Sequence, residues 1–483
     1  MSSPISPAPS APDAPYVIDP AGGCPHALNA RLRAAHGPVA EVVLPGGVPG
    51  AVVLGHEALK EFLGHPEVAK DARHFPALHD GTIPRDWPLR AFANAQGMHT
   101  ADDADHRRLR ALVGKAFTAR QVERLRPRVE ELTAELLDDL ARAAAQAPDG
   151  VADLREHFAL PLPMSVICEL LGVDPEHRGR LHHLSNKVII ATDTTPAEAM
   201  AAVRELVELM GTIAATRREA PGEDLTSALI AAREDDGDQL SEAELTGTMR
   251  LMLVAGHETT LNLISNAVRA LCTHRDQLAL VLDGKATWSD VVDETLRWDG
   301  PVSWFPFRYP TRDLTLDGTV IPQGTPVLAG YTAAGRDEAF HGPDADRFDI
   351  TRPTAARSLS FGHGAHYCVG APLARLEATI ALERLFTRFP DLDLATPEAE
   401  LPHQRSFIGN SVETLPVRLA GNCRARRPPD RSRGAADRHP SVRGRSGATW
   451  PAIACSTLEL AFWTVLPRPC VATVAMAIFL DGT

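Results

Sequence analysis

The alternation of apolar and polar residues along the chain predicts a mainly helical protein. Apolar residues recur at helical spacing through residues 124–145. A longer helical pattern runs through residues 240–274, and it begins with Ser241 and Glu244, which are spaced as a capping box. A helix this long and this apolar is expected to cross the centre of the molecule.

Short runs typical of strands lie near both ends of this helical region. Residues 40–55 and 314–330 each combine β-branched residues with glycine and proline, so each run predicts a β-hairpin. The composition is even between residues 16 and 420, with no internal repeat and no long linker. The pattern therefore predicts a mainly α fold with a smaller β portion, in one domain over residues 16–420.

The two ends of the chain differ from this domain. Residues 1–15 are rich in Ser, Pro and Ala and lack the basic and apolar regions of a signal peptide, so a disordered arm is predicted. Residues 421–447 carry eight arginines and no lysine, and the apolar runs that follow are too short to span a membrane. This basic run could bind a surface. For residues 421–483 we favour a tail that is disordered or not native.

Composition narrows the possible functions. The chain has 483 residues and a formal net charge of -13, which argues against a nucleic-acid-binding protein. Its seven cysteines are scattered and form no Cys-x-x-Cys pair, which excludes a disulfide framework and a zinc ribbon. With no signal peptide or membrane span, a cytoplasmic protein is expected.

One cysteine has an unusual setting. Cys368 stands directly before a helix-like run that has Pro372 in its first turn. A cysteine at a helix N-terminus faces free N–H groups, which favour the thiolate. Gly362, Gly364 and Gly370 would let the backbone turn tightly or approach a flat ligand. A single cysteine is usually a small buried apolar residue, but this framing by glycines favours a functional one.

Residues 361–370, FGHGAHYCVG, resemble the haem-binding signature of the cytochrome P450 superfamily, Phe-x-x-Gly-x-His-x-Cys-x-Gly. All five specified positions match. The resemblance covers residues 16–420 and is greatest to soluble actinobacterial members. It implies a P450 fold with haem b between a long distal helix and the cysteine loop, and it makes the Cys368 thiolate the iron ligand. The cofactor-binding residues that it implies in this loop are Phe361, Gly362, His366, Cys368 and Gly370.

The middle of the long helix contains residues that weaken a helix. These are Gly256 and the two threonines at 259 and 260, which have low helix propensity. Residues that weaken a helix in its middle point to a functional site. The resemblance implies that this is the oxygen-activation groove. Glu258 and Thr259 would then be catalytic, with Thr259 bonding to dioxygen and Glu258 supplying protons through water. Ala255 is implied as a haem contact, and His257 is expected to make a structural contact.

Charged pairs with helical spacing give two further sites. Glu294 and Arg297 are three residues apart, so they can pair on one helix face. The resemblance implies a buried structural network in which Arg347 is the third member. His106 and Arg110 are four residues apart, and two cations held together need an anion between them. The resemblance implies that these two residues bind the haem propionates together with Arg308 and His366.

The substrate pocket is inferred from the resemblance alone. Its expected walls are residues 79–96, 302–307 and 407–411 together with the long helix, all largely apolar, which suits a hydrophobic substrate of middle size. The individual residues expected in the pocket are Leu251, Val254, Val302, Trp304 and Ile408.

The implied function is a haem-thiolate monooxygenase of secondary metabolism. It would insert one oxygen atom from O2 into a hydrophobic steroid, a polyketide or macrolide, or a similar natural product. No flavin or nicotinamide fingerprint is present, so the electrons are expected from a separate ferredoxin and its reductase. A haem-thiolate protein that uses peroxide or catalyses oxidative coupling is one alternative. A haem-binding sensor without turnover is the other.

Overall fold

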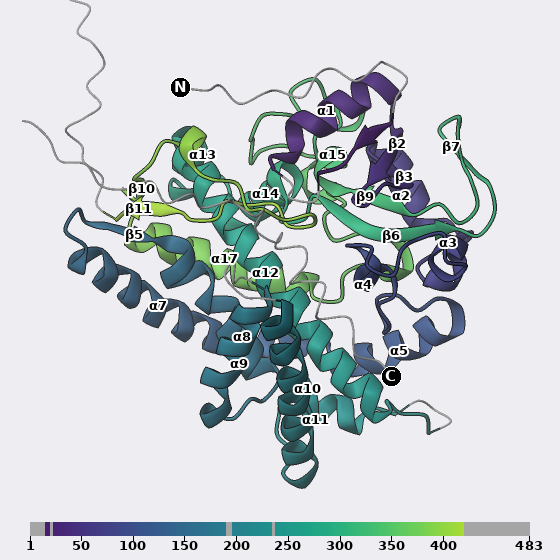
Figure 1. Ribbon diagram of the computed structural model, residues 1–483. Coiled ribbons are helices and arrows are strands. Elements are labelled where there is room, and N and C mark those ends of the chain that lie inside the picture. The colour runs from purple at the N-terminus through teal and green to yellow at the C-terminus, as the bar shows by residue number, and fades with distance from the viewer. Residues whose placement is uncertain (1–14, 20–22, 190–195, 234–236, 420–483) are drawn as a thin grey trace, which may run out of the picture. The chain divides into compact units, whose positions relative to one another are not determined.

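The computed structural model describes residues 15–19, 23–189, 196–233 and 237–419 (Figure 1). The predicted arm, apart from residue 15, and the predicted tail at 421–483 lie outside these residues, so both boundaries stay predictions. The helices of the helical region are α5 (Asp103–Ala116), α6 (Ala119–Arg124), α7 (Arg126–Gln146), α8 (Pro161–Leu170), α9 (Pro175–Ile189), α10 (Pro196–Glu219), α11 (Leu225–Ala231), α12 (Glu242–Thr273), α13 (Arg275–Leu282), α14 (Trp288–Asp299) and α17 (Ala371–Arg388). The other α-helices are α1 (Pro25–His36), α2 (His56–Gly64), α3 (Pro76–His79), α4 (Arg90–Ala93), α15 (Tyr331–Gly335) and α16 (Glu338–His341).

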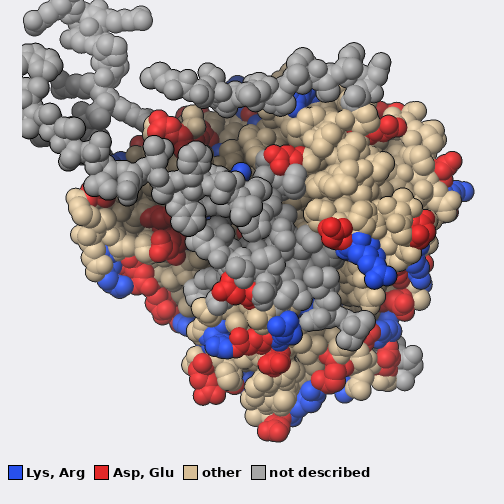
Figure 2. All heavy atoms as spheres, viewed as in Figure 1, with Lys and Arg blue, Asp and Glu red and all other residues tan. Residues whose placement is uncertain are grey.

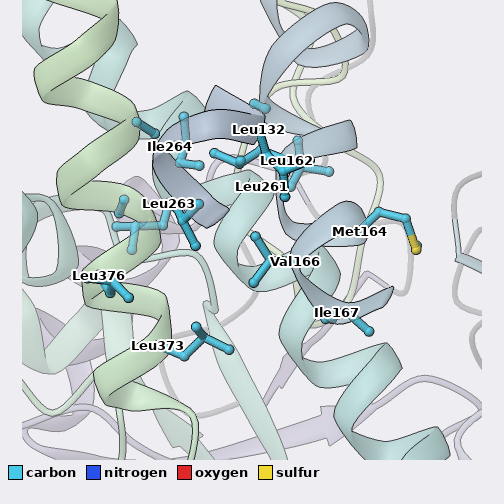
Figure 3. Packing of buried hydrophobic residues seen from close by; sticks show 14 of the residues in the cluster. Leu132, Leu162, Met164, Val166, Ile167, Leu261, Leu263, Ile264, Leu373 and Leu376 are labelled. Carbon is cyan, nitrogen blue, oxygen red and sulfur yellow. The ribbon is translucent and has the colours of Figure 1, made fainter. Parts of the chain in front are cut away.

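The long helix α12 is the centre of the helical region. The predicted capping box is present, with the Ser241 side chain accepting from the Glu244 backbone and the Glu244 side chain accepting in return. Figure 3 shows leucines of α12 packed between α8 and α17, for example Leu261 and Leu263. Each buried leucine contributes about 1.5–3 kcal/mol. The predicted central position of this helix is therefore confirmed.

Within the described ranges, the β portion consists of three sheets. Six strands pair in the order β1 (Tyr16–Val17), β2 (Val39–Leu44), β3 (Val48–Val53), β9 (Val327–Gly330), β6 (Trp304–Pro310) and β4 (Val68–Ala69). A second sheet has the order β10 (Asp393–Leu394), β11 (Pro416–Arg418) and β5 (Val151–Asp153). The remaining pair is β7 (Leu314–Leu316) with β8 (Thr319–Ile321).

The two predicted hairpins have different outcomes. Strands β2 and β3 form the hairpin expected at residues 40–55. The hairpin expected at residues 314–330 ends after β8, so the second half of that prediction is wrong. Strand β9 instead lies between β3 and β6 in the large sheet. Its four residues are all buried, so they gain more by entering the large sheet than by extending an exposed hairpin.

The surface of the described region is mixed in charge on the face that Figure 2 draws. Lys and Arg side chains alternate there with Asp and Glu side chains over the helices at the bottom of the view. Among the described residues, a search for helices with the length and apolar character of a membrane span finds none.

Candidate active site

The loop before α17 is shaped by glycines in the left-handed backbone region. Gly362 has a φ of 76° and Gly364 a φ of 74°, a region that other residues rarely adopt. A Cβ atom at Gly364 would lie 2.9 Å from the Leu63 carbonyl oxygen of α2. The Cys368 N–H donates to the Phe361 carbonyl at 2.9 Å and closes the loop. The glycines therefore allow the loop that carries Cys368 to lie against α2, directly before α17.

Cys368 is exposed to solvent, although many protein atoms lie around its thiol. Burial raises the pKa of the Cys368 thiol, against the Gly370 N–H, Arg110 and the Ala371 N–H, which lower it. The helix terminus alone therefore does not produce the expected thiolate, and a bound metal cation would supply the missing stabilisation.

The predicted cationic residues of α5, β6 and the cysteine loop come together. The rings of His106 and His366 lie 4.0 Å apart between their centroids. His366 Nε2 lies 3.9 Å from Asp102 Oδ1. Burial, opposed by the Asp102 hydrogen bond and aided by the charge of Arg308, lowers the pKa of His366 to about 4. Arg110 donates from Nη2 to the Tyr367 carbonyl at 2.7 Å, next to the cysteine.

Arg308 is the most informative member of this group. Its side chain is buried, with 6% of the residue exposed, and it makes no hydrogen bond or ion pair with any described residue. The register of β6 against β9 shifts between Phe305 and Arg308, so the regular pairing is interrupted directly before the arginine. An unpaired buried cation is costly, so this position calls for an anion from outside the chain.

Sequence reasoning missed Lys70 and Asp102. Lys70 is buried, and its Nζ has one long hydrogen bond, 3.4 Å to the Pro306 carbonyl, and lies 4.8 Å above the Phe305 ring. Burial, aided by Arg308, lowers the pKa of Lys70 to about 7. Asp102 accepts hydrogen bonds from the Lys70 N–H and the Asp71 N–H. No pattern around Lys70 signals this position, because only the tertiary fold brings it to β6.

We call Lys70, Arg110 and Arg308, with the two histidines His106 and His366, the cation cluster. When Lys70 is protonated, the three cations Lys70, Arg110 and Arg308 face one carboxylate among the described residues, Asp102, so two positive charges remain without a carboxylate partner. A flat cofactor with two carboxylates and a metal centre would neutralise the cation cluster and engage Cys368 at the same time. The residues present therefore fit haem.

On α12, Ala255 and Thr259 occupy one face, four residues apart. Ala255 is exposed, whereas most neighbouring positions of the helix are at least partly buried. The Thr259 hydroxyl donates to the Ala255 carbonyl at 2.7 Å, so the helix continues unbroken through the predicted weak point. A Cβ atom at Gly256 would lie 2.9 Å from Ile167 Cδ1. This glycine therefore allows close packing against α8.

Glu258 lies next to this face. Its Oε1 accepts a hydrogen bond of 2.8 Å from Gln404 Nε2. Burial raises the pKa of Glu258, while the Gln404 hydrogen bond and the charge of Arg155 oppose the rise. His257, for which we expected a structural contact, is fully buried. Glu258 and Thr259 are therefore an acid and an alcohol held side by side at the centre of the molecule.

Glu294 and Arg297 form a buried bidentate ion pair on α14, with distances of 2.7 and 2.6 Å. The predicted third member is wrong, because the Arg347 side chain is exposed and only its carbonyl accepts from Arg297, at 2.8 Å. Arg352 takes its place, with Nε 3.7 Å from Glu294 Oε1. The neighbours Ala345 and Phe348 are buried, which leaves the Arg347 side chain pointing outwards.

The expected pocket residues are only partly placed as predicted. Trp304 is corrected: only 5% of it is exposed, and its indole N–H donates to Asn29 Oδ1 of α1 at 3.0 Å. Phe305, the next residue, is 36% exposed, because successive strand residues face opposite sides. Four residues are partly buried and available to contact a ligand: Leu251, Val254, Val302 and Ile408. Phe361 in the cysteine loop is also partly buried, with Arg375 5.2 Å from its ring centroid.

Comparison with known proteins matches these sites to one family. A family model described as Cytochrome P450 matches residues 288–409, which include the Glu294–Arg297 pair and Cys368. The chain is 41% identical over 412 residues to 2-hydroxy-5-methyl-1-naphthoate 7-hydroxylase of Streptomyces carzinostaticus, over 85% of this chain and 99% of that protein. It is also 41% identical over 395 residues to cytochrome P450 monooxygenase PikC of Streptomyces venezuelae, over 82% of this chain and 91% of that protein.

A solved structure agrees with these relatives. Testerone-bound CYP154C4 from Streptomyces sp. ATCC 11861 superimposes with a TM-score of 0.78 at 44% sequence identity. The match covers 84% of this chain and 99% of that one. The similarity therefore extends over nearly the whole of each relative.

Proposed function

This chain belongs to the cytochrome P450 family and is a monooxygenase of that family, and from this premise we propose that it oxidises a hydrophobic natural product. The oxygen atom inserted would come from O2. The observation that carries the proposal is the cation cluster beside Cys368, whose two unpaired positive charges suit the two propionates of haem b.

In this proposal each residue has a defined task toward the cofactor. Cys368 is the iron ligand, and the cation cluster holds the propionates. Ala255 on α12 and Phe361, Gly362 and Gly370 in the cysteine loop line the two faces of the cofactor. When bound, haem supplies the activation of O2, and the protein positions and tunes it.

Glu258 and Thr259 are proposed to manage protons. Because burial raises the pKa of Glu258 above its ordinary value, its carboxyl can hold a proton closer to neutral pH and then give it up. The Thr259 hydroxyl bonds to the Ala255 carbonyl and keeps its oxygen as an acceptor. Together the two side chains would pass a proton toward the exposed face of α12.

We propose a steroid, a polyketide or macrolide, or a similar natural product as the substrate. The supporting observations are the apolar residues open to contact, Leu251, Val254, Val302, Phe305 and Ile408, and the relatives named for a naphthoate and for testerone. Such a surface offers few polar groups to orient a substrate, so shape would decide selectivity.

The electron source is proposed to be a separate ferredoxin with its reductase. The sequence has no fingerprint for flavin or nicotinamide binding, so the chain needs an external donor. Dependence of turnover on this external electron donor distinguishes the proposal from the two alternatives. These are a peroxide-using or coupling enzyme and a sensor without turnover.

The test combines a spectrum with turnover. The reduced protein with carbon monoxide should show the red-shifted Soret band of thiolate ligation, and Cys368→Ala should abolish it. Turnover with ferredoxin, reductase and 18O2 should place one labelled atom in the product. Label arriving only from peroxide would favour the first alternative, and a normal haem spectrum with no product across a natural-product library would favour the sensor.

A further inference from the structure

Glu258 is contacted by one segment outside its own helix, and the charge of a second element acts on it. Gln404, in the segment between η5 (Glu398–Glu400) and β11, donates the 2.8 Å hydrogen bond to its Oε1. Gly409 of the same segment approaches so closely that a Cβ atom there would lie 3.1 Å from Glu258 Oε1 and 3.0 Å from Ser406 Oγ. The carboxyl is therefore held against this segment, and glycine at 409 leaves room for it.

Arg155 approaches from the π-helical turn η2 (Arg155–Ala159). Only 8% of the residue is exposed, and its Nη1 donates to Asn262 Oδ1 at 3.1 Å, Ser265 Oγ at 3.2 Å and Ser411 Oγ at 2.9 Å. All three acceptors are neutral, and Arg155 makes no ion pair within the described chain. The Arg155 guanidinium is therefore held in place by neutral groups. No carboxylate of the described residues is in contact with it to cancel its charge.

The charged groups around this site are few. Arg155 is the charged side chain that acts on the pKa of Glu258, and Glu258 is the carboxylate that acts most on the pKa of Arg155, ahead of Asp153 and Glu413. Asn262, one helical turn beyond Glu258, has a buried Nδ2 without a hydrogen-bond partner, 3.4 Å from the point where a Gly409 Cβ would lie. A donor is therefore available close to the carboxyl.

We propose that Arg155 and Gln404 are positioning residues for Glu258: Gln404 fixes the carboxyl by its hydrogen bond, and Arg155 keeps it ionisable from a buried site behind α12. The proposal rests on the proposed function, in which Glu258 delivers protons. It differs from a purely structural role because a neutral residue of similar size at position 155 would fill the space but remove the charge.

The direction of the effect follows from the charges. Burial favours the neutral form of Glu258, and the cation at position 155 favours the ionised form. Removing this cation raises the pKa of Glu258, so the carboxyl stays protonated to higher pH. The decline of proton delivery at alkaline pH therefore begins at a higher pH.

The experiment measures the titration of Glu258 directly in the haem-loaded full chain. Infrared difference spectra follow the carboxyl stretch with pH, and Glu258→Gln identifies the band. Arg155→Met and Gln404→Leu should each raise the titration midpoint, Gln404→Leu by more, and Arg155→Lys should keep the midpoint close to the wild-type value. Ser411→Ala, which removes one hydrogen bond from Arg155 but no charge, should leave the midpoint in place.

Product formed per electron pair should be measured against pH in the same variants. The pH at which it declines on the alkaline side should rise in the same order as the titration midpoint. A midpoint that stays unchanged in Arg155→Met, or that moves equally in Ser411→Ala, would overturn the proposal. If Arg155→Met does not fold, the comparison of Arg155→Lys and Gln404→Leu with wild type decides it. Failure of the proposed function is seen separately, as unchanged coupling in Glu258→Gln, because the infrared titration does not depend on turnover.

Discussion

Two groups of buried charges in this molecule have opposite balances. At Glu294 and Arg297 every charge has a partner, since Arg297 also donates to the Gly335 and Ala345 carbonyls at 2.7 and 2.6 Å. In the cation cluster, Arg308 is also buried, but its side chain has no hydrogen-bond or ion-pair partner among the described residues. Because an unpaired charge is costly to bury, the first group indicates a structural network and the second indicates a binding site. Burial alone does not separate the two roles, whereas the balance of charge does.

The largest expected effect comes from breaking the balanced pair. Arg297→Met leaves Glu294 buried without its partner, which costs about 3–5 kcal/mol. We expect loss of most of the folded, haem-binding protein, measured by denaturant unfolding and haem content. The control is Arg347→Met: the exposed side chain makes this change worth no more than about 0.5 kcal/mol. A similar loss in both variants would restore Arg347 as the third member of the network.

The same substitution at Arg308 should have a different result. Arg308→Met removes a cation that has no partner among the described residues, so the unfolding free energy of the haem-free protein should not fall. Haem retention should fall instead, because a charge-assisted hydrogen bond to a propionate contributes about 1.5–3 kcal/mol. Transfer of haem to apomyoglobin should then be about tenfold to a hundredfold faster. If Arg308→Met destabilises the haem-free protein as Arg297→Met does, the contrast between the two groups fails.

The contrast was only partly predictable from the sequence. The Cys368 loop, the capping box of α12 and the Glu294–Arg297 spacing are local patterns, and each was placed correctly. The third partner of Glu294 depends on how residues 344–352 turn, and this geometry is not encoded in a spacing. The side of β6 on which Trp304 and Phe305 fall was missed for the same kind of reason, because it depends on the pairing with β9.

Lys70 shows the same limit at the site itself. Its neighbours Pro306 and Arg308 are more than two hundred residues away in the chain, and only the sheet pairing of β4 with β6 brings them together. The four residues that the resemblance assigned to the propionates, His106, Arg110, Arg308 and His366, were found because their own segments carry recognisable motifs. A cation that completes a charge balance has no such motif.

A smaller effect is expected at Lys70, and it depends on pH. Burial lowers the pKa of Lys70 to about 7 before an anion is bound. A dianionic cofactor favours the charged lysine, so haem binding takes up a proton above pH 7 and haem retention should weaken as pH rises through that value. Lys70→Met should lose haem a few times faster at pH 6.5 and show a flatter pH dependence. Haem transfer rates between pH 6.5 and 9 measure this, and equal slopes in both proteins would exclude Lys70 from the cation cluster.

The smallest effect is expected from the charges of the predicted tail. The predicted tail, residues 421–483, carries nine arginines and four acidic residues. Any pairing of these arginines with acidic residues of the domain would be exposed to solvent, and such pairs contribute only about 0–1 kcal/mol each and weaken with salt. We therefore expect a chain that ends at Gly421 to keep its haem content and to unfold within a few degrees of the full chain. Thermal unfolding at low and high salt, with haem content measured beside it, provides the test. Loss of haem or turnover on truncation would show that the proposed domain boundary at residue 420 is wrong, and it would make the tail a third kind of charged region, exposed yet required.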